Sequence, residues 1–190
     1  MKTFVVGDIH GRCAQLQCLL DMLPRDEASD MLVFLGDLID RGPDAPGCVE
    51  FVSELERNNP DHVRCLRGNH EQMLLDFIDG TSNIWITPVT GGERTFEQYA
   101  GKTLDVRTEL DLEEARQTIE RKIPNEHLEF FRARPFFYED DYAIYVHAGL
   151  DHGKHPSETS PQLLLWTRDL DFYKNYRGKP CLFGHTPTPF

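Results

Sequence analysis

Residues 31–42 read MLVFLGDLIDRG, a short apolar run that ends at Gly36 and is followed by the metal-capable side chain of Asp37. Two other stretches repeat this order of features, TFVVGDIHG at residues 3–11 and HVRCLRGNHE at residues 62–71. Short apolar runs bounded by glycine are typical of buried strands. Helix-patterned stretches follow each run, so the three units predict the order β-α-β-α-β-α.

The stretches between these runs predict helices that cross over a parallel sheet. CAQLQCLLDML follows Gly11, and GCVEFVSELERN follows Pro46. Each carries apolar residues three and four positions apart, which is the spacing of a helix that packs on one face. Parallel strands need such crossover connections, and the sequence therefore predicts an α/β fold.

The remainder of the chain predicts a helical insertion and then a return to strands. Residues from about 81 to 135 contain loop-like residues followed by the charged helical stretches DLEEARQTIERKI and NEHLEFFRA, with Pro124 at a helix start. FFYE and YAIYVHAG predict two strands, joined by a tight turn at Asp140 and Asp141. The apolar run CLFGH predicts a last strand.

Length and composition indicate one folded domain over residues 1–190, with the cap or insertion at about 81–135 inside it. The chain has 190 residues, of which 39% are hydrophobic, and this suits a single packed core. We expect no membrane span and no signal peptide, because no apolar run approaches the roughly 20 residues that a span needs. The five cysteines show no CxxC pairing, so we expect reduced thiols and a cytoplasmic protein.

The net charge of −12 bears on possible partners. Stable nucleic-acid binding relies on clustered Lys and Arg, so no nucleic-acid partner is expected. An anionic ligand of so acidic a chain would need local positive charge, which bound divalent metals can supply. The sequence gives no indication of oligomeric state.

Metal-capable side chains recur where the predicted strands end. Ligands gather at the carboxyl ends of strands in open α/β sheets, and the candidates there are Asp8, His10, Asp37, Asp40, Asn69, His70, His147 and His185. An isolated Gly-Asp after a strand is usually a turn, and an isolated histidine there is usually a hydrogen-bonded loop residue. Recurrence at five strand ends favours a metal site instead, with oxygen and imidazole ligands suited to Mn, Fe or Zn.

The motifs GDIHG, GDLIDRGPD, GNHE, HAG and GH, in this order, resemble the signature of the calcineurin-like metallophosphoesterases and, within them, of the phosphoprotein phosphatase branch. The resemblance runs from Gly7 to His185. It implies a layered α/β/β/α sandwich with a helical insertion, and a metal-dependent serine/threonine protein phosphatase. Family members commonly continue past the last of these histidines with further strands and a Gly-rich turn, whereas the sequence given ends at Phe190.

The resemblance also implies roles for the candidate residues. Two divalent ions, with Mn favoured and Fe or Zn as alternatives, would be bound by six residues: Asp8 and His10 on the first ion, Asp37 bridging both, and Asn69, His147 and His185 on the second. Such a pair of ions acidifies a bridging water to a hydroxide that attacks phosphorus.

Four further residues would assist the reaction. His70 would protonate the leaving oxygen, with Asp40 holding its imidazole protonated and oriented. The guanidinium groups of Arg41 and Arg168 would bind the phosphate oxygens. Arg41 could instead form a surface ion pair with Asp44, but its place inside DRGPD favours phosphate contact, and we expect Asp44 to cap the helix after it.

The remaining histidines have simpler explanations. HAGLDHGKH brings His152 and His155 close to His147 in sequence, yet both fall in a loop and are expected at exposed or rim positions rather than in a local metal site. His62 and His127 do not belong to the recurring pattern of metal-capable residues at strand ends, and we interpret both as structural.

Substrate class is harder to infer than chemistry. Symmetrical diadenosine tetraphosphate hydrolases share the fold and the metal site, but they tend to lack the aspartate before the arginine of DRG and to read GNHD. Asp40 and Glu71 therefore favour a phosphoprotein or phosphopeptide substrate. A third alternative is an inactive relative that keeps the metal site and only binds phosphate, against which His70 and Asp40 argue.

Overall fold

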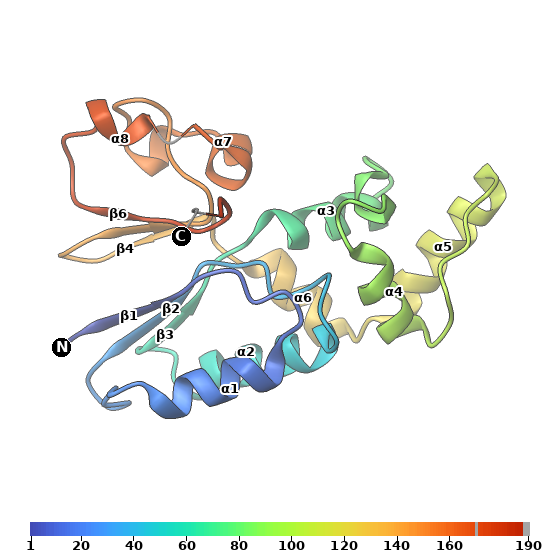
Figure 1. The fold of residues 1–190 in the computed structure, drawn as a ribbon, viewed down its shortest axis with the longest axis horizontal. Helices are drawn as coiled ribbons and strands as arrows, with labels where there is room; N and C mark the ends of the chain where they lie inside the picture. The colour runs from blue at the N-terminus through green and yellow to red at the C-terminus, as the bar shows by residue number, and fades with distance from the viewer. Residues whose placement is uncertain (170, 188–190) are drawn as a thin grey trace.

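Three short parallel strands form the sheet that carries the first half of the site. The computed structural model describes residues 1–169 and 171–187. β1 (Thr3–Val6), β2 (Met31–Phe34) and β3 (Val63–Cys65) pair in the order β1-β2-β3. α1 (Cys13–Met22) and α2 (Ala45–Asn58) cover one face of this sheet (Figure 1). The strand and crossover order is the one predicted from the three repeated units.

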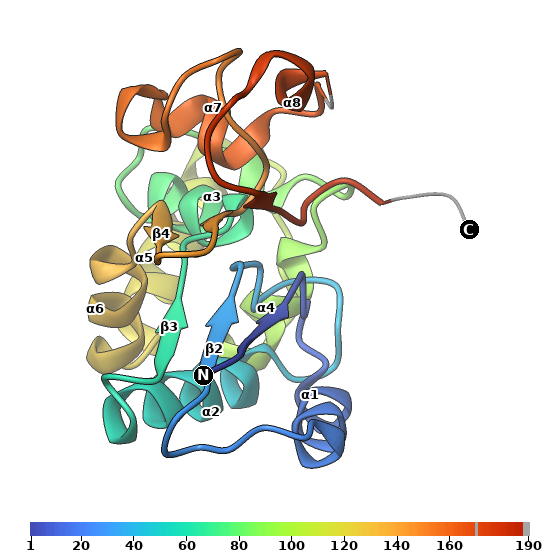
Figure 2. The same ribbon diagram turned by 90° about the vertical axis from the view of Figure 1, so that its left-hand side faces the viewer.

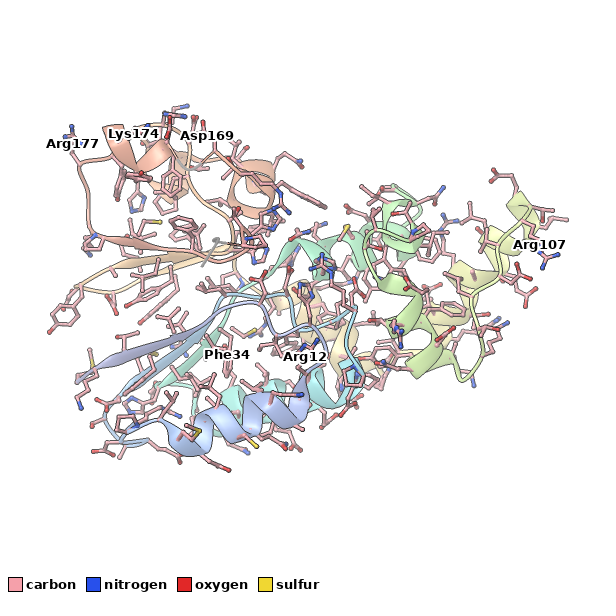
Figure 3. All side chains as sticks on the ribbon, viewed as in Figure 1. Arg12, Phe34, Arg107, Asp169, Lys174 and Arg177 are labelled. Atoms are coloured by element: carbon pink, nitrogen blue, oxygen red, sulfur yellow. The ribbon has the colours of Figure 1, made fainter. Side chains whose placement is uncertain are left out.

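A second sheet lies on the other face of the first. It contains β4 (Phe137–Glu139), β5 (Ile144–Val146) and β6 (Cys181–Leu182), with β4 and β5 antiparallel and β5 and β6 parallel. Phe34 of β2 points toward the helices (Figure 3), where it joins the cluster that includes residues of α1 and α2. Val33 points the opposite way and packs with Tyr145 of β5. The alternation of side chains along β2 thus builds two cores, one on each face.

Two helices complete a fourth layer. α7 (Pro161–Trp166) and α8 (Phe172–Asn175) follow the short 3-10 helix η2 (Pro156–Glu158) and cover the outer face of the second sheet. Ile144 and Val146 pack there with Leu164 and Phe172. The layers therefore run α, β, β, α, which confirms the expected sandwich.

The helical insertion lies to one side of the two sheets in Figure 1 and behind them in the turned view of Figure 2. It follows α3 (Asn69–Ile78) and contains η1 (Ile84–Ile86), α4 (Gly92–Ala100), α5 (Glu109–Lys122) and α6 (Asn125–Ala133). Trp85, Phe96, Ile119 and Phe131 are buried in the same cluster as the core under α2. The insertion, called the cap below, is thus packed continuously with the first sheet's helices. The single-domain boundary itself stays a prediction.

Several local expectations need correction. α4 lies in a region interpreted as loop, because its start at Gly91 and Gly92 looks like a turn. The hairpin connection spans four residues rather than two, since β4 ends at Glu139 and β5 begins at Ile144.

Other expectations agree with the structure. Asp44 caps α2, with its carboxylate accepting the N–H of Gly47 at 2.9 Å. All five cysteines are free thiols. Among the helices of residues 1–169 and 171–187, none combines the length and apolar character required to cross a bilayer.

Candidate metal centre

Five non-glycine residues in the described parts of the chain have a positive φ, and all five are predicted site residues. They are His10, Asp37, Asp40, Arg41 and His185, with φ between 47° and 71°. L-residues rarely adopt this conformation, and where they do the surrounding structure must hold it. The backbone is therefore constrained at the strand ends that carry the candidate ligands.

Two glycines allow the strand-end loops to approach each other. A Cβ on Gly36 (φ 96°) would lie 2.3 Å from the backbone nitrogen of Gly68, so the loops after β2 and β3 touch only because no side chain stands there. Likewise, a Cβ on Gly42 would lie 1.9 Å from the carbonyl oxygen of His10. These contacts bring side chains from three strand ends into one place.

Four electron-pair donors converge beneath these loops. Nε2 of His147 lies 2.8 Å from Oδ1 of Asn69, 3.2 Å from Nδ1 of His185 and 3.5 Å from Oδ2 of Asp37. Nδ1 of His185 is also 2.9 Å from Oδ1 of Asn69. All four residues are buried. These are the four residues expected to hold one of the two ions.

Proton counting indicates that a cation suits this group. Nδ1 of His147 faces the carbonyl oxygen of Leu35 at 2.8 Å, and because a carbonyl only accepts, the neutral ring carries its lone pair on Nε2. Only His185 can then supply a proton to the group, and its Nε2 is buried without a partner. Ligands about 2.1 Å from an ion lie about 3.0 to 3.4 Å apart, which matches these separations. The donor set therefore fits a metal ion.

The charge states also suit a metal site. Burial, followed by repulsion from His147 and Arg168, lowers the pKa of His185 to about 4, so this ring is neutral near pH 7. Burial acts to raise the pKa of Asp37, but the neighbouring histidines outweigh it, and the pKa falls below its ordinary value. A neutral His185 ring and an ionised Asp37 carboxylate are the forms that bind metal.

Asp37 also belongs to a second group of potential ligands. Its Oδ2 lies 3.7 Å from Nε2 of His10 and 3.9 Å from Nε2 of His70. Asp37 thus stands between two clusters, as a bridging carboxylate would. Asp8 lies outside both clusters. It lines a cavity together with His10 and Asp37, and its Oδ1 accepts the backbone N–H of His185 at 3.0 Å. Its role as a ligand stays a prediction.

His70 and Asp40 form a close buried pair. Nδ1 of His70 donates to Oδ2 of Asp40 at 2.6 Å, and the two side chains are 3% and 0% exposed. Burial lowers the pKa of His70, but the hydrogen bond to Asp40 and the charges of Asp37 and Asp40 outweigh it, so the pKa lies above its ordinary value. The pair thus favours a protonated imidazole.

The two arginines predicted to bind phosphate line one cavity of about 600 Å³ together with the ligand side chains Asp8, His10, Asp37, Asn69 and His185. The guanidinium of Arg41 lies 3.0 Å from Nε2 of His10 and 3.2 Å from Nε2 of His70. Arg168 is exposed at the cavity. Eight of the ten predicted site residues line this cavity. The other two are attached to residues that do: Asp40 pairs with His70, and His147 contacts Asp37 and Asn69.

The sequence profile of the family described as calcineurin-like phosphoesterase matches residues 1–189. This chain belongs to that family. Family membership places it in the metallophosphoesterase class of hydrolases, and the two clusters of His and Asp side chains are candidate ligand groups for the metal site of that class.

Curated relatives of this calcineurin-like phosphoesterase carry two different names. A serine/threonine-protein phosphatase 1 from Salmonella typhimurium is 42% identical over 91 residues, which is 47% of this chain and 38% of that protein. A symmetrical bis(5'-nucleosyl)-tetraphosphatase from Buchnera aphidicola is 41% identical over 83 residues, 44% of this chain and 28% of that protein. The matched part thus spans well under half the length of these relatives.

Solved structures agree on the fold. A protein proposed to be a diadenosine tetraphosphatase superposes with a TM-score of 0.64 at 22% identity, covering 96% of this chain and 74% of that one. A metallophosphoesterase from Sphaerobacter thermophilus gives 0.56 at 21% identity, covering 97% and 59%. At this identity the likeness concerns architecture alone.

Glu71 of the phosphoesterase motif GNHE has a structural position that the sequence did not indicate. Its carboxylate is 1% exposed and accepts the backbone N–H groups of Asp37 at 2.9 Å, Leu38 at 2.7 Å and Gly68 at 2.9 Å. Burial, followed by the charge of Asp37, raises the pKa of Glu71 to about 7. Because Glu71 faces backbone rather than the cavity, it offers no direct contact by which it could select a substrate.

Two cap residues in the phosphoesterase site also escaped prediction. Trp85 and Thr95 both donate to the carboxylate of Asp40, from 45 and 55 residues further along the chain. No local motif indicates such distant contacts. A buried aspartate beside a histidine does indicate that its second oxygen needs donors, and a tryptophan and a threonine are suitable ones.

The other histidines lie outside the two ligand clusters. His152 pairs with Asp169 at 2.7 Å on the surface, and His155 contacts Glu139 at 2.8 Å. His127 is buried between Tyr99 and Glu50. His152 and His155 thus lie at the surface, as expected, and hydrogen bonds hold His127 in the cap.

Proposed function

We propose that this calcineurin-like phosphoesterase hydrolyses phosphate monoesters, first among them phosphoserine and phosphothreonine in proteins. One observation carries the proposal: Asp37 lies between two groups of metal-capable side chains, and the His70–Asp40 pair adjoins them at the same cavity. Metal ligands, a proton donor and phosphate-binding arginines are the parts that such a hydrolysis needs.

His10, Asp37, Asn69, His147 and His185 would hold two divalent ions, with Asp8 as a further ligand. When bound, the ions would supply Lewis-acid stabilisation and activation of the attacking water. Mn²⁺ is the favoured ion, and Fe or Zn are alternatives, because mixed oxygen and imidazole ligands admit each of them.

His70 would act on the leaving group. Its Nδ1 is engaged by Asp40, so the opposite nitrogen, Nε2, is the atom that can give a proton to the seryl or threonyl oxygen. Arg41 contacts Nε2 of both His10 and His70. Binding of the ester would draw this guanidinium onto the phosphate oxygens, together with that of Arg168, and leave Nε2 of His70 free to protonate the leaving oxygen.

A symmetrical dinucleotide tetraphosphatase is the second candidate, because several relatives carry that name at identities close to that of the protein phosphatase. Asp40 beside His70 supports the monoesterase. Hydrolysis of a phosphoserine peptide and of diadenosine tetraphosphate should be compared with the same Mn²⁺-loaded protein. A higher kcat/KM for the peptide is expected, and a strong preference for the dinucleotide would overturn the protein-phosphatase assignment.

A phosphate-binding scaffold without activity is the third candidate. Replacement of His70 by Asn puts a smaller polar side chain there and removes the titratable proton donor. We expect turnover of the phosphoserine peptide to fall by about 10² to 10⁴-fold, with metal content unchanged. An unchanged rate would remove His70 from the mechanism, and no metal-dependent turnover by the wild-type chain would favour the scaffold.

The expected setting remains part of the proposal. Five free cysteines agree with a reducing compartment such as the cytoplasm. A phosphoprotein substrate would be a transient partner at the cavity, and the net charge of −12 argues against standing nucleic-acid binding.

A further inference from the structure

The buried carboxylate of Asp40 has more partners than His70 alone. Nε1 of Trp85 donates to its Oδ1 and Oδ2 at 3.1 and 3.2 Å, and the hydroxyl of Thr95 donates to Oδ1 at 2.7 Å. The backbone N–H of Asp40 in turn donates to the Thr95 hydroxyl at 2.9 Å. Trp85, Thr95 and Asp40 are each 0% exposed. Both carboxylate oxygens are thereby fixed by side chains of the cap.

The same cap segment, residues 85–95, also holds the backbone beside Asp40. The N–H of Arg41 donates to the carbonyl oxygen of Gly91 at 3.2 Å, and a Cβ on Gly91 would lie 2.7 Å from Cγ of Arg41. Asp40 and Arg41 have φ of 71° and 66°, a conformation that packing must maintain. Residues 85–95 therefore fix both the side chain and the main chain at this point.

We propose that Trp85 and Thr95 are positioning residues for proton transfer, acting on His70 through Asp40. This inference rests on the proposed function, because it takes His70 as the donor to the leaving oxygen. A carboxylate with three donors is confined to one orientation, and Nδ1 of His70 is held by it at 2.6 Å. Loss of the Trp85 or Thr95 donor lets the carboxylate rotate and turns the imidazole away from the leaving group.

Leaving-group dependence distinguishes this role from a structural one. Phenolate from phenyl phosphate leaves poorly without a proton, whereas p-nitrophenolate leaves readily. We expect Trp85→Phe and Thr95→Val each to lower kcat for phenyl phosphate by about tenfold, with a much smaller loss for p-nitrophenyl phosphate and little change in KM. Thr95→Ser keeps the hydroxyl and should restore the phenyl phosphate rate.

Matched controls come from the same cap. Tyr99→Phe, like Trp85→Phe, removes a hydrogen-bond donor from an aromatic side chain. The hydroxyl of Tyr99, however, contacts His127 and not Asp40. Thr118→Val removes a buried hydroxyl from α5, outside the cavity lining. Both controls should lose activity, if at all, equally on the two esters. Thermal unfolding of every variant identifies any that do not fold.

A double-mutant cycle with His70→Asn completes the test. If the cap residues act through His70, Trp85→Phe should cause no further loss in the His70→Asn background. Two results would overturn the inference while leaving the proposed function intact. One is that Trp85→Phe lowers the rates of both esters equally, and the other is that it lowers the phenyl phosphate rate as much in the His70→Asn background as in wild type. If His70→Asn lost both esters equally, His70 would not be the donor to the leaving group, and this inference alone would fail. If wild type showed no metal-dependent turnover, the proposed function and this inference would fail together.

The contact itself has a readout that needs no turnover. The indole N–H of Trp85 should give an NMR signal that moves on Asp40→Asn, because a carboxylate acceptor is replaced by an amide. The indole signal of Trp166 serves as the internal reference. A Trp85 signal that does not respond would overturn the inference, since its hydrogen bond to Asp40 would then be absent in solution.

Discussion

At the scale of single residues, Glu71 has a role distinct from chemistry. Its carboxylate joins backbone N–H groups of the loops after β2 and β3, which carry Asp37 and Asn69. The two carboxyl oxygens supply acceptors for these groups, and buried N–H groups left without an acceptor are costly. Glu71 thus fixes the distance between two ligand-bearing loops.

Glu71→Gln should destabilise the fold. The amide offers one acceptor atom and turns an NH₂ group toward backbone donors, so we expect the free energy of unfolding to fall by about 2 kcal/mol. Urea unfolding monitored by circular dichroism measures this. Glu54→Gln, which alters an exposed pair with Arg57, is the control and should change stability by less than about 0.5 kcal/mol. Equal stability of wild type and Glu71→Gln would contradict the bracing role.

At the scale of elements, the turn between β4 and β5 connects the two sheets. Oδ2 of Asp140 accepts the hydroxyls of Thr3 on β1 at 3.3 Å and of Tyr145 on β5 at 2.8 Å. Burial acts to raise the pKa of Asp140, but backbone and hydroxyl donors outweigh it, so the pKa lies below its ordinary value. The ionised form is therefore the one that stabilises this connection.

The sign of the pKa shift sets the pH dependence. A carboxyl group whose pKa is depressed by folding stabilises the folded state above its unfolded pKa of about 3.9, and this contribution is lost as the pH falls through the folded value. Asp140→Asn should therefore be less stable than wild type at pH 6, with the difference shrinking toward pH 3. Thermal unfolding across this range measures it. The exposed neighbour Asp141→Asn is the control, and a pH-independent difference for Asp140→Asn would contradict the prediction.

The cap also shapes the mouth of the cavity. Val89 and Ile84 line it although they are 83% and 44% exposed. Apolar side chains at the rim gain free energy when substrate covers them. Val89→Ser should raise KM for a phosphopeptide with an apolar residue beside the phosphoserine by about three- to tenfold, leaving kcat unchanged. Leu110→Ser, equally exposed on α5, is the control; an unchanged KM for Val89→Ser would exclude substrate contact there.

At the scale of the whole molecule, the sequence predicted what local patterns encode. Apolar runs ending in Gly-Asp or Gly-Asn located β1, β2 and β3, and with them Asp37 and Asn69. The burial of β2 on both faces could also be anticipated from its continuous apolar run. These features depend on residues adjacent in the chain.

What the sequence did not predict depends on contacts across the fold. Trp85 and Thr95 reach Asp40 from the cap, and Glu71 reaches the backbone of Asp37 from 34 residues away. α4 was missed because its helical spacing follows two glycines, and packing of Phe96 in the cap core stabilises it where local propensity is weak. Hydrogen bonds between residues far apart in the chain leave no periodic pattern and no local motif in the sequence.

The central claim is that this chain holds a two-metal centre bridged by Asp37. Metal-stripped protein should be titrated with Mn²⁺ while bound metal and p-nitrophenyl phosphate hydrolysis are measured, beside Asp37→Asn. We predict that turnover appears as two ions bind per chain and that Asp37→Asn loses both the second ion and the turnover. Hydrolysis by the metal-stripped protein, or undiminished hydrolysis by Asp37→Asn, would contradict the account.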